Sequence, residues 1–259
     1  IYRTSGAISI GGIRLDVIAD CDVLVVGAGT SGMPAAVVAA QRGADTIAVE
    51  KYGDVGGTHT IGGVSKYWYG RRTEFFERLD ADAFETMRET RMPKCMGKLG
   101  TMMKSGVRLL THCMAVGALV EGRTLAGVVV VTPQGLAAIK AERIIDATGD
   151  GDIAARAGSD MTYGTRRDAM TLWYSFAQYR GTNPEARRHF AYVVDPRDPT
   201  DMTRAILAGR RYKKSRDVTA PQYYLTPRES RHIRGGYRVT VADVLAGRRF
   251  EDLLLIGRS

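Results

Sequence analysis

The chain of 259 residues has few cysteines and no long hydrophobic run. No window approaches the roughly 18 consecutive apolar residues of a membrane-spanning helix, so we expect no membrane span. Cys21, Cys95 and Cys113 are too few and too scattered for a disulfide framework or a zinc site. We therefore expect no bound metal and a reducing, cytoplasmic location. The sequence also has no internal repeat and no low-complexity tract.

The composition is that of a folded protein with an uneven charge. Apolar residues make up 44% of the chain and charged residues 25%, close to the average for globular domains, which excludes wholesale disorder. Of the net charge of +9, most comes from residues 201–259, which hold 13 Lys or Arg against 6 Asp or Glu. This basic region indicates an anionic partner: an acidic substrate, a cofactor phosphate or a nucleic acid. A solvated basic face explains it equally well.

The first fifty residues predict a β-hairpin followed by a β-α-β unit. The hairpin consists of Ala7–Ile10 and Ile13–Ile18 and turns at Gly11-Gly12. The next strand, Asp22–Val26, is apolar without alternation, as in a parallel sheet buried on both faces. A helix over 31–42 and a strand over 46–50 complete the unit.

The remainder predicts a β-meander and several short elements. We expect a helix at 81–92, an ambiguous stretch at 93–105, and strands at 107–111, 114–120, 124–132, 136–141 and 143–147. Short helices are expected at 153–157, at 201–208 and at 240–246, the last capped by Thr240 with Asp243. A buried strand is expected at 253–256.

The segment Gly27-Ala28-Gly29-Thr30-Ser31-Gly32 has the G-x-G-x-x-G spacing between the predicted strand and helix. In this pattern Gly27 permits a tight turn, Gly29 leaves room for a diphosphate, and Gly32 lets helix and strand pack closely. The helix N-terminus attracts the phosphates. Glu50 follows 23 residues after Gly27, where its carboxylate can accept both hydroxyls of an adenosine ribose. The sequence therefore predicts a dinucleotide site that disfavours NADP.

A second glycine-rich segment favours FAD over NAD. Residues 51–58 (KYGDVGGT) continue to Ile61-Gly62-Gly63-Val64, which suits a backbone that runs beside a ribityl chain and a flavin ring. A strand that ends at Asp146-Ala147-Thr148-Gly149 returns beneath the dinucleotide and approaches it at Gly149.

Together these residues resemble the FAD-dependent oxidoreductases of the glutathione-reductase-like, two-dinucleotide-fold superfamily. The similar segments are DVLVVGAGTSG (22–32), VEKYGDVGGTHTIGGV (49–64), ERIIDATGDGDIAARAG (142–158) and PRESRHIRGGYRVTVADVLAGRRF (227–250). The resemblance implies an α/β fold: a Rossmann-like FAD/NAD(P)-binding domain with a parallel sheet, a β-meander insertion and a substrate-side region. The cofactor-binding residues that it implies are Gly27, Gly29, Thr30, Ser31, Gly32, Glu50, Lys51, Gly56, Gly57, Thr58, His59, Gly149 and Asp150.

The expected domain organisation follows from this resemblance. Residues 1–72 and 107–160 are expected to form the FAD-binding domain, 73–106 a helical insertion, and 161–259 a substrate-side region. Family members continue past a strand like 252–257 into a glycine-rich helix, whereas this chain stops at Ser259. We therefore expect a missing C-terminal segment, a processed or partner subunit, or a last strand that corresponds to an earlier element of the family fold, and the oligomeric state stays open.

Four side chains are candidates for chemistry. Thr58-His59-Thr60 is similar to the Ser-His-Thr segment of the succinate dehydrogenase and fumarate reductase group, so His59 is a candidate for covalent flavin attachment, for a base near the ring, or for a loop hydrogen bond. Arg231 and Arg234 are candidate anchors for a carboxylate or phosphate. His232 is a candidate proton shuttle. The alternatives for this cluster are a salt-bridged surface segment and a docking face for another subunit.

These observations predict an FAD-dependent oxidoreductase that transfers a hydride between a small organic substrate, an anion being one option, and flavin N5. One alternative is a flavin-dependent tRNA-modifying enzyme, because residues 210–216 (RRYKKSR) form a basic run with an aromatic inside. This nucleic-acid reading is the less favoured one. Another alternative is a catalytically silent FAD-binding subunit or fragment.

Overall fold

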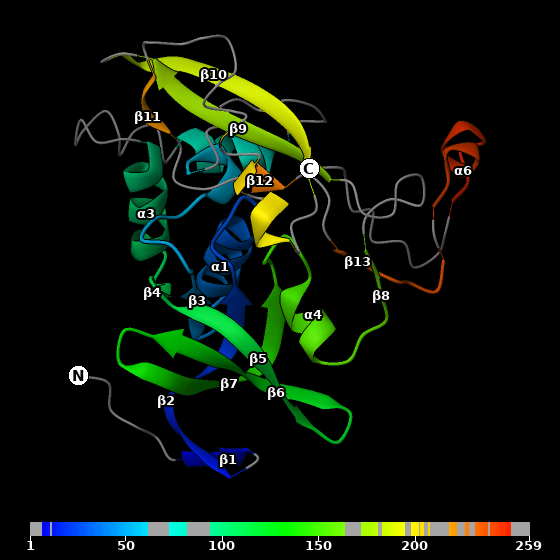
Figure 1. Cartoon of the computed structure of the whole chain (residues 1–259). Helices are drawn as coiled ribbons and strands as arrows, with labels where there is room; N and C mark the ends of the chain where they lie inside the picture. Colours follow the sequence, from blue (N-terminus) through cyan, green and yellow to red (C-terminus); the bar gives the residue numbers. More distant parts are fainter. Residues whose placement is uncertain are drawn as a thin grey trace.

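The computed structural model describes residues 7–10, 12–61, 73–81, 94–163, 172–180, 183–194, 198–201, 203–204, 207, 218–221, 226–227, 231–237 and 239–249. Its centre is a seven-stranded mixed sheet with the order β4-β3-β2-β7-β6-β5, in which β1 pairs with β2 (Figure 1). Strands β4, β3, β2 and β7 are mutually parallel, and β5 and β6 are antiparallel to their neighbours. This is the expected Rossmann-like α/β fold.

Strand β2 (Ile13–Val26) is a single strand of 14 residues. Its first residues pair antiparallel with β1 (Ala7–Ile10), with Ile10 opposite Ile13, which confirms the hairpin. The prediction of two separate strands, ending at Ile18 and resuming at Asp22, is wrong. Asp20 and Asp22 are exposed while Cys21 between them is buried. These residues therefore continue the strand with alternating faces, and Cys21 pairs with Ala141 of β7 (Gly135–Asp146).

The meander consists of β5 (Met114–Glu121), β6 (Thr124–Thr132) and β7. Here too one strand replaces the two that were expected, because β7 continues through Glu142 and Arg143, which are exposed. β4 (Arg108–Leu110) does not belong to the meander. It pairs in parallel with β3 (Thr46–Val49) and forms the edge of the parallel part of the sheet.

Two apolar clusters cover the two faces of the parallel strands. On one face Val25 and Ala48 pack with α1 (Gly32–Gln41), through Met33 and Val37 among others. On the other face Leu24 packs with residues of the meander such as Val128. The uninterrupted apolar run in β2 is thus buried on both sides, as predicted.

The region expected as a helical insertion contributes to the α1 side of this core. Residues 74–81 are helical, and α3 spans Lys94–Lys104, within the stretch that the sequence left ambiguous. Leu79 and Met102 are buried in the same cluster as Met33. Their burial closes the face of the sheet that α1 only partly covers.

The second half of the chain adds smaller units. A four-stranded sheet contains β10 (Asn183–Val194), β9 (Leu172–Arg180), β11 (Val218–Pro221) and β12 (Thr226–Pro227), and it lies at the top of Figure 1, with β1 at the bottom. A two-stranded ribbon pairs β8 (Met161–Tyr163) with β13 (Arg231–Ile233). The short helices are α4 (Asp152–Arg156) and α6 (Val241–Leu245).

The predicted capping box at α6 is confirmed. The Asp243 amide donates to the Thr240 hydroxyl at 3.2 Å, and Asp243 Oδ2 accepts from the Thr240 amide at 2.8 Å. Hydrogen bonds from the Thr240 hydroxyl and amide and from Tyr237 hold the pKa of Asp243 well below its usual range. The capped turn therefore stays intact at every pH at which this carboxylate is ionised.

Several expectations lie outside the described residues. They are residues 82–92 of the helix expected at 81–92, the strand at 253–256, the basic run at 210–216 and the glycines at 62–63. Within the described residues, no helix combines the length and apolar character that crossing a bilayer requires. The same residues contain no group of three or more His, Cys, Asp or Glu that could hold a metal ion.

Candidate functional site

The turn from β2 into α1 contains two glycines that the fold itself requires. Gly27 has a φ of +93°, and a Cβ built on it would lie 2.6 Å from the carbonyl oxygen of Ala147. A Cβ on Gly32 would lie 1.8 Å from the carbonyl oxygen of Gly27. The turn can therefore pack beneath the end of β7 only with glycine at both positions.

Gly29 differs from these two glycines because nothing in the described structure fills the space beside it. The nearest described atom to a Cβ on Gly29 would be the α-carbon of Gly57, at 3.9 Å. Its backbone also lies outside the left-handed region. The described fold would accept a side chain at this position. The described fold therefore does not itself require glycine at this position.

The N-terminus of α1 adjoins this space. An α-helix leaves its first N–H groups without intrahelical partners, and these groups carry partial positive charge. Ser31 occupies the cap position, yet in the described structure its side chain makes no capping hydrogen bond. In this turn the Met33 amide donates to the Gly29 carbonyl at 3.1 Å and Pro34 has no N–H, so the Gly32 amide and the positive end of the helix dipole are what the α1 terminus offers an anion.

The second glycine segment packs directly on the first. The Gly56 amide donates to the Ala28 carbonyl at 2.8 Å, and the Thr30 hydroxyl donates to the Gly56 carbonyl at 3.3 Å. Gly57 opens a short 3-10 turn, η1 (Gly57–His59), and a Cβ on it would lie 2.9 Å from the α-carbon of Gly29. The structure thus brings two of the predicted cofactor-binding segments together at Gly29.

Glu50 lies at the carboxyl end of β3 and is 6% exposed. Its carboxylate accepts hydrogen bonds from two amides, Ala28 at 2.9 Å and Tyr52 at 3.1 Å, one on each oxygen. Burial raises the pKa of this carboxyl, although both hydrogen bonds and Lys51 oppose the rise. Because each carboxylate oxygen can accept a second hydrogen bond, the contacts to Ala28 and Tyr52 leave capacity for two ribose hydroxyls.

The segment after β7 approaches the same region. Burial, together with the negative charges of Glu50 and Asp150, raises the pKa of Tyr52 to about 12. Glu50 and Asp150 thus both lie close enough to Tyr52 to affect its hydroxyl. Gly149 has a φ of +83°, and no described atom lies within 4 Å of a Cβ built on it. Lys51 is exposed and places its Nζ 5.1 Å from the centre of the Tyr52 ring.

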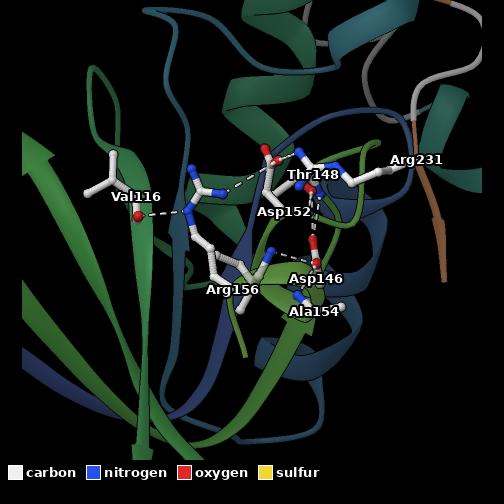
Figure 2. Close-up of polar contacts among 8 residues, drawn as sticks. Val116, Asp146, Thr148, Asp152, Ala154, Arg156 and Arg231 are labelled. Carbon is white, nitrogen blue, oxygen red and sulfur yellow. Dashed lines mark hydrogen bonds and ion pairs between the residues drawn. The ribbon is translucent and has the colours of Figure 1, made fainter. Parts of the chain in front are cut away.

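Asp146 organises this segment, and sequence reasoning did not assign it a role. Its Oδ2 accepts hydrogen bonds from the amides of Ile153 and Ala154, both at 2.9 Å, and its Oδ1 accepts from the amide and hydroxyl of Thr148 (Figure 2). The Thr148 hydroxyl accepts in turn from the Asp152 amide at 2.9 Å. The carboxylate thereby fixes the whole 147–152 loop. An aspartate six residues before the short helix α4 is the available sequence signal.

The arginines predicted as anchors are engaged in ion pairs. Arg231 Nη2 lies 2.5 Å from Asp152 Oδ1, as Figure 2 shows, and Arg234 Nη1 lies 3.1 Å from Asp160 Oδ2. These pairs fix β13 beside β8 and next to the 147–152 loop. His232, between the two arginines, is exposed. The structure thus brings Arg231 to the loop that follows Asp150 and supports the salt-bridge alternative for both arginines.

His59 lies in the second glycine-rich segment, apart from the β8–β13 ribbon that contains Arg231 and His232. It is half-buried in η1, next to Thr58, and its ring meets Phe76 edge-to-face with centroids 6.5 Å apart. Lys98 of α3, which the sequence gave no reason to single out, is 8% exposed. Its Cδ lies 2.8 Å from the Cβ position of Gly56.

The site fits an extended dinucleotide. A diphosphate fits the space beside Gly29 at the N-terminus of α1, and a ribose fits the carboxylate of Glu50. The second glycine segment continues from Gly57 toward His59, which leaves backbone available beside a further group. These features are those of a Rossmann-type dinucleotide-binding protein. Its second glycine segment is one that binding of a nicotinamide cofactor does not require.

The chain belongs to the FAD dependent oxidoreductase family, whose model matches residues 22–227. FAD is accordingly the cofactor. No curated protein sequence matches the chain.

Solved structures with a similar fold include a hydroxylase and a flavin-dependent brominase. The anhydrotetracycline hydroxylase OxyS from Streptomyces rimosus has 14% identity and a TM-score of 0.54, with 83% of this chain and 54% of that chain covered. BexE, described for oxidation during BE-7585A biosynthesis, has 13% identity and a TM-score of 0.51, with 85% and 55% covered. The flavin-dependent brominase Bmp2 has 13% identity and a TM-score of 0.51, with 83% and 68% covered. The chain thus spans little more than half the length of the first two.

Proposed function

We propose that this protein transfers a hydride between a small organic substrate and N5 of bound FAD. The observation that carries the proposal is the space beside Gly29, which the described protein atoms leave open at the N-terminus of α1. Membership of the FAD dependent oxidoreductase family supports it. The isoalloxazine ring of FAD supplies the electron chemistry when bound.

The residues of the chain would bind and orient the cofactor. The Gly32 amide and the positive end of the α1 dipole would hold the diphosphate, and Glu50 would accept hydrogen bonds from the ribose hydroxyls. The hydrogen bonds between Gly56, Ala28 and Thr30 keep the two glycine segments in register, so that the diphosphate and the flavin half are held by one rigid unit. The Asp146 network holds Gly149 and Asp150 in place beneath them.

For the proton, His59 is the candidate with the better position. It lies two residues after Gly57, in the segment that leads away from the diphosphate. A half-buried imidazole in this segment would be able to hold or deliver a proton when FAD is bound. Arg231 and Arg234 remain candidates for an anionic substrate, which would have to compete with Asp152 and Asp160.

The cofactor site is tested by Glu50→Arg, with Glu121→Arg at the exposed end of β5 as the matched control. Arginine at position 50 places a cation beside the N–H donors of Ala28 and Tyr52 and offers no acceptor to the ribose. We expect FAD binding to be lost in Glu50→Arg and unchanged in Glu121→Arg. Unchanged flavin content in Glu50→Arg would refute the site.

The hydride step is tested on the FAD-loaded chain under nitrogen with a panel of small 2-hydroxy acids and amino acids. We expect at least one of these carboxylates to bleach the visible absorption of the flavin, and deuterium at the donated C–H bond to slow the bleaching. In His59→Asn, the pH profile of the bleaching should change. A chain that binds FAD but is reduced by none of these donors would favour the catalytically silent alternative.

A further inference from the structure

Strand β4 ends beside the predicted ribose site. The α1 terminus follows β2, Glu50 follows β3, and residues 111–113 follow β4. Because the parallel strands lie in the order β4-β3-β2, these three segments are neighbours at the carboxyl ends of the strands. Ligands of such sheets bind across the carboxyl ends of adjacent strands. A nucleotide whose diphosphate lies at α1 and whose ribose lies at Glu50 therefore places its base at the end of β4.

His112 occupies this position in an unusual conformation. Its φ of +51° makes it the one non-glycine residue with positive φ among the described residues. Such a backbone costs free energy for a residue with a Cβ and persists where the surroundings impose it. The chain around it is fixed on both sides: the His112 amide donates to the Tyr52 carbonyl at 3.2 Å, and the Cys113 amide donates to the Glu50 carbonyl at 2.9 Å.

The imidazole of His112 lies against Gly53. A Cβ built on Gly53 would be 2.7 Å from His112 Nε2 and 3.0 Å from Cε1, so the ring edge can reach this place only because residue 53 is glycine. The residue as a whole is exposed. The ring is therefore held by its edge, next to the segment that carries Glu50, while a large part of its surface remains accessible.

We propose that the His112 ring forms one wall of the adenine subsite and stacks on the base of FAD. Bases stack on flat aromatic side chains, histidine included. The free energy of this contact offsets the cost of the strained backbone at His112. The burial of Cys113 after it and the pairing of β4 before it fix the backbone from which the ring extends. The inference rests on the proposed FAD site, and specifically on ribose binding at Glu50.

The test compares His112→Gly and His112→Asn with the parent chain. Both variants lack the ring, and both residues tolerate positive φ, so neither should lower the thermal midpoint of the apoprotein. The dissociation constants of FAD, by fluorescence quenching, and of ADP, by competition with FAD, are then measured. ADP contains the adenosine half without the flavin and is the matched probe.

We expect the dissociation constants of FAD and of ADP to rise by the same factor, about tenfold, in both variants. Unchanged FAD and ADP affinities in stable variants would overturn the inference and leave the FAD site intact. A rise for FAD alone would also overturn it, because the ring would then act on the flavin half. A parent chain that binds neither compound would overturn the FAD site itself.

Discussion

Alanine substitutions at Gly29 and Gly32 distinguish a glycine proposed to serve ligand binding from a glycine that the fold requires. In Gly29→Ala the new methyl group would have no described neighbour nearer than 3.9 Å, and the backbone is outside the left-handed region. The apoprotein should therefore be as stable as the parent, or more stable by about 0.4–1 kcal/mol because the unfolded chain loses entropy. The matched substitution Gly32→Ala places its methyl 1.8 Å from a carbonyl oxygen and should cost at least about 3 kcal/mol.

The effect on FAD follows from the same geometry. A methyl group at position 29 keeps the diphosphate away from the first amides of α1. Loss of one hydrogen bond to a charged group costs about 1.5–3 kcal/mol, so the FAD dissociation constant should rise roughly 10- to 100-fold. Chemical denaturation of the apoprotein and a fluorescence titration with FAD measure the two quantities. A stable Gly29→Ala variant that binds FAD as tightly as the parent would refute the assignment of this space.

Three further expectations concern the framework of the site. Asp146→Ala leaves four donors without their acceptor and should lower the free energy of unfolding by about 2–4 kcal/mol, measured by urea denaturation. A loss below about 1 kcal/mol would contradict the role of Asp146 in fixing the 147–152 loop. A double-mutant cycle on Arg231 and Asp152, whose side chains are 27% and 24% exposed, should give a coupling of about 0.5–1.5 kcal/mol, and zero coupling would contradict the ion pair. Burial raises the pKa of Cys21 and of Cys113 to about 11, so at pH 8 about one thiol in a thousand is ionised. Both cysteines should therefore resist thiol reagents in the native protein and react faster as the pH rises. Rapid labelling at pH 8, located by mass spectrometry, would contradict their burial.

The sequence was most informative where function depends on local spacing. The glycines from 27 to 32 lie within six residues of one another, and the capping residues Thr240 and Asp243 lie within four. Each pattern requires a particular backbone. The buried strand before Gly27 could be predicted for the same reason. These features depend on short-range geometry, which the order of residues determines directly.

The continuity of β2 and β7 could not be predicted from residue types. Asp20 and Asp22 alternate with the buried Cys21, and Glu142 and Arg143 are exposed, which resembles two short strands separated by polar turns. Pairing between β2 and β7 is what extends both strands, and it joins residues more than a hundred positions apart. Polar residues within a strand are informative only once the partner strand is known.

Contacts between distant segments were also inaccessible to sequence reasoning. The sequence makes Arg231 a candidate anchor, but it cannot identify the partner Asp152, which lies 79 positions earlier in the chain. The position of His112 against Gly53 depends on the pairing of β3 with β4 and has no sequence signature. Both cases show side chains whose surroundings are set by the sheet order.

The visible absorption of the purified chain, before and after addition of FAD, tests the central claim most directly. The account predicts the two-banded spectrum of a protein-bound flavin, either as purified or after loading. Acid precipitation then locates the flavin: release into the supernatant means non-covalent FAD, and retention in the pellet means covalent attachment, with His59 as the residue to replace. A folded chain that remains colourless with added FAD, and whose fluorescence titration shows no binding, would contradict the account.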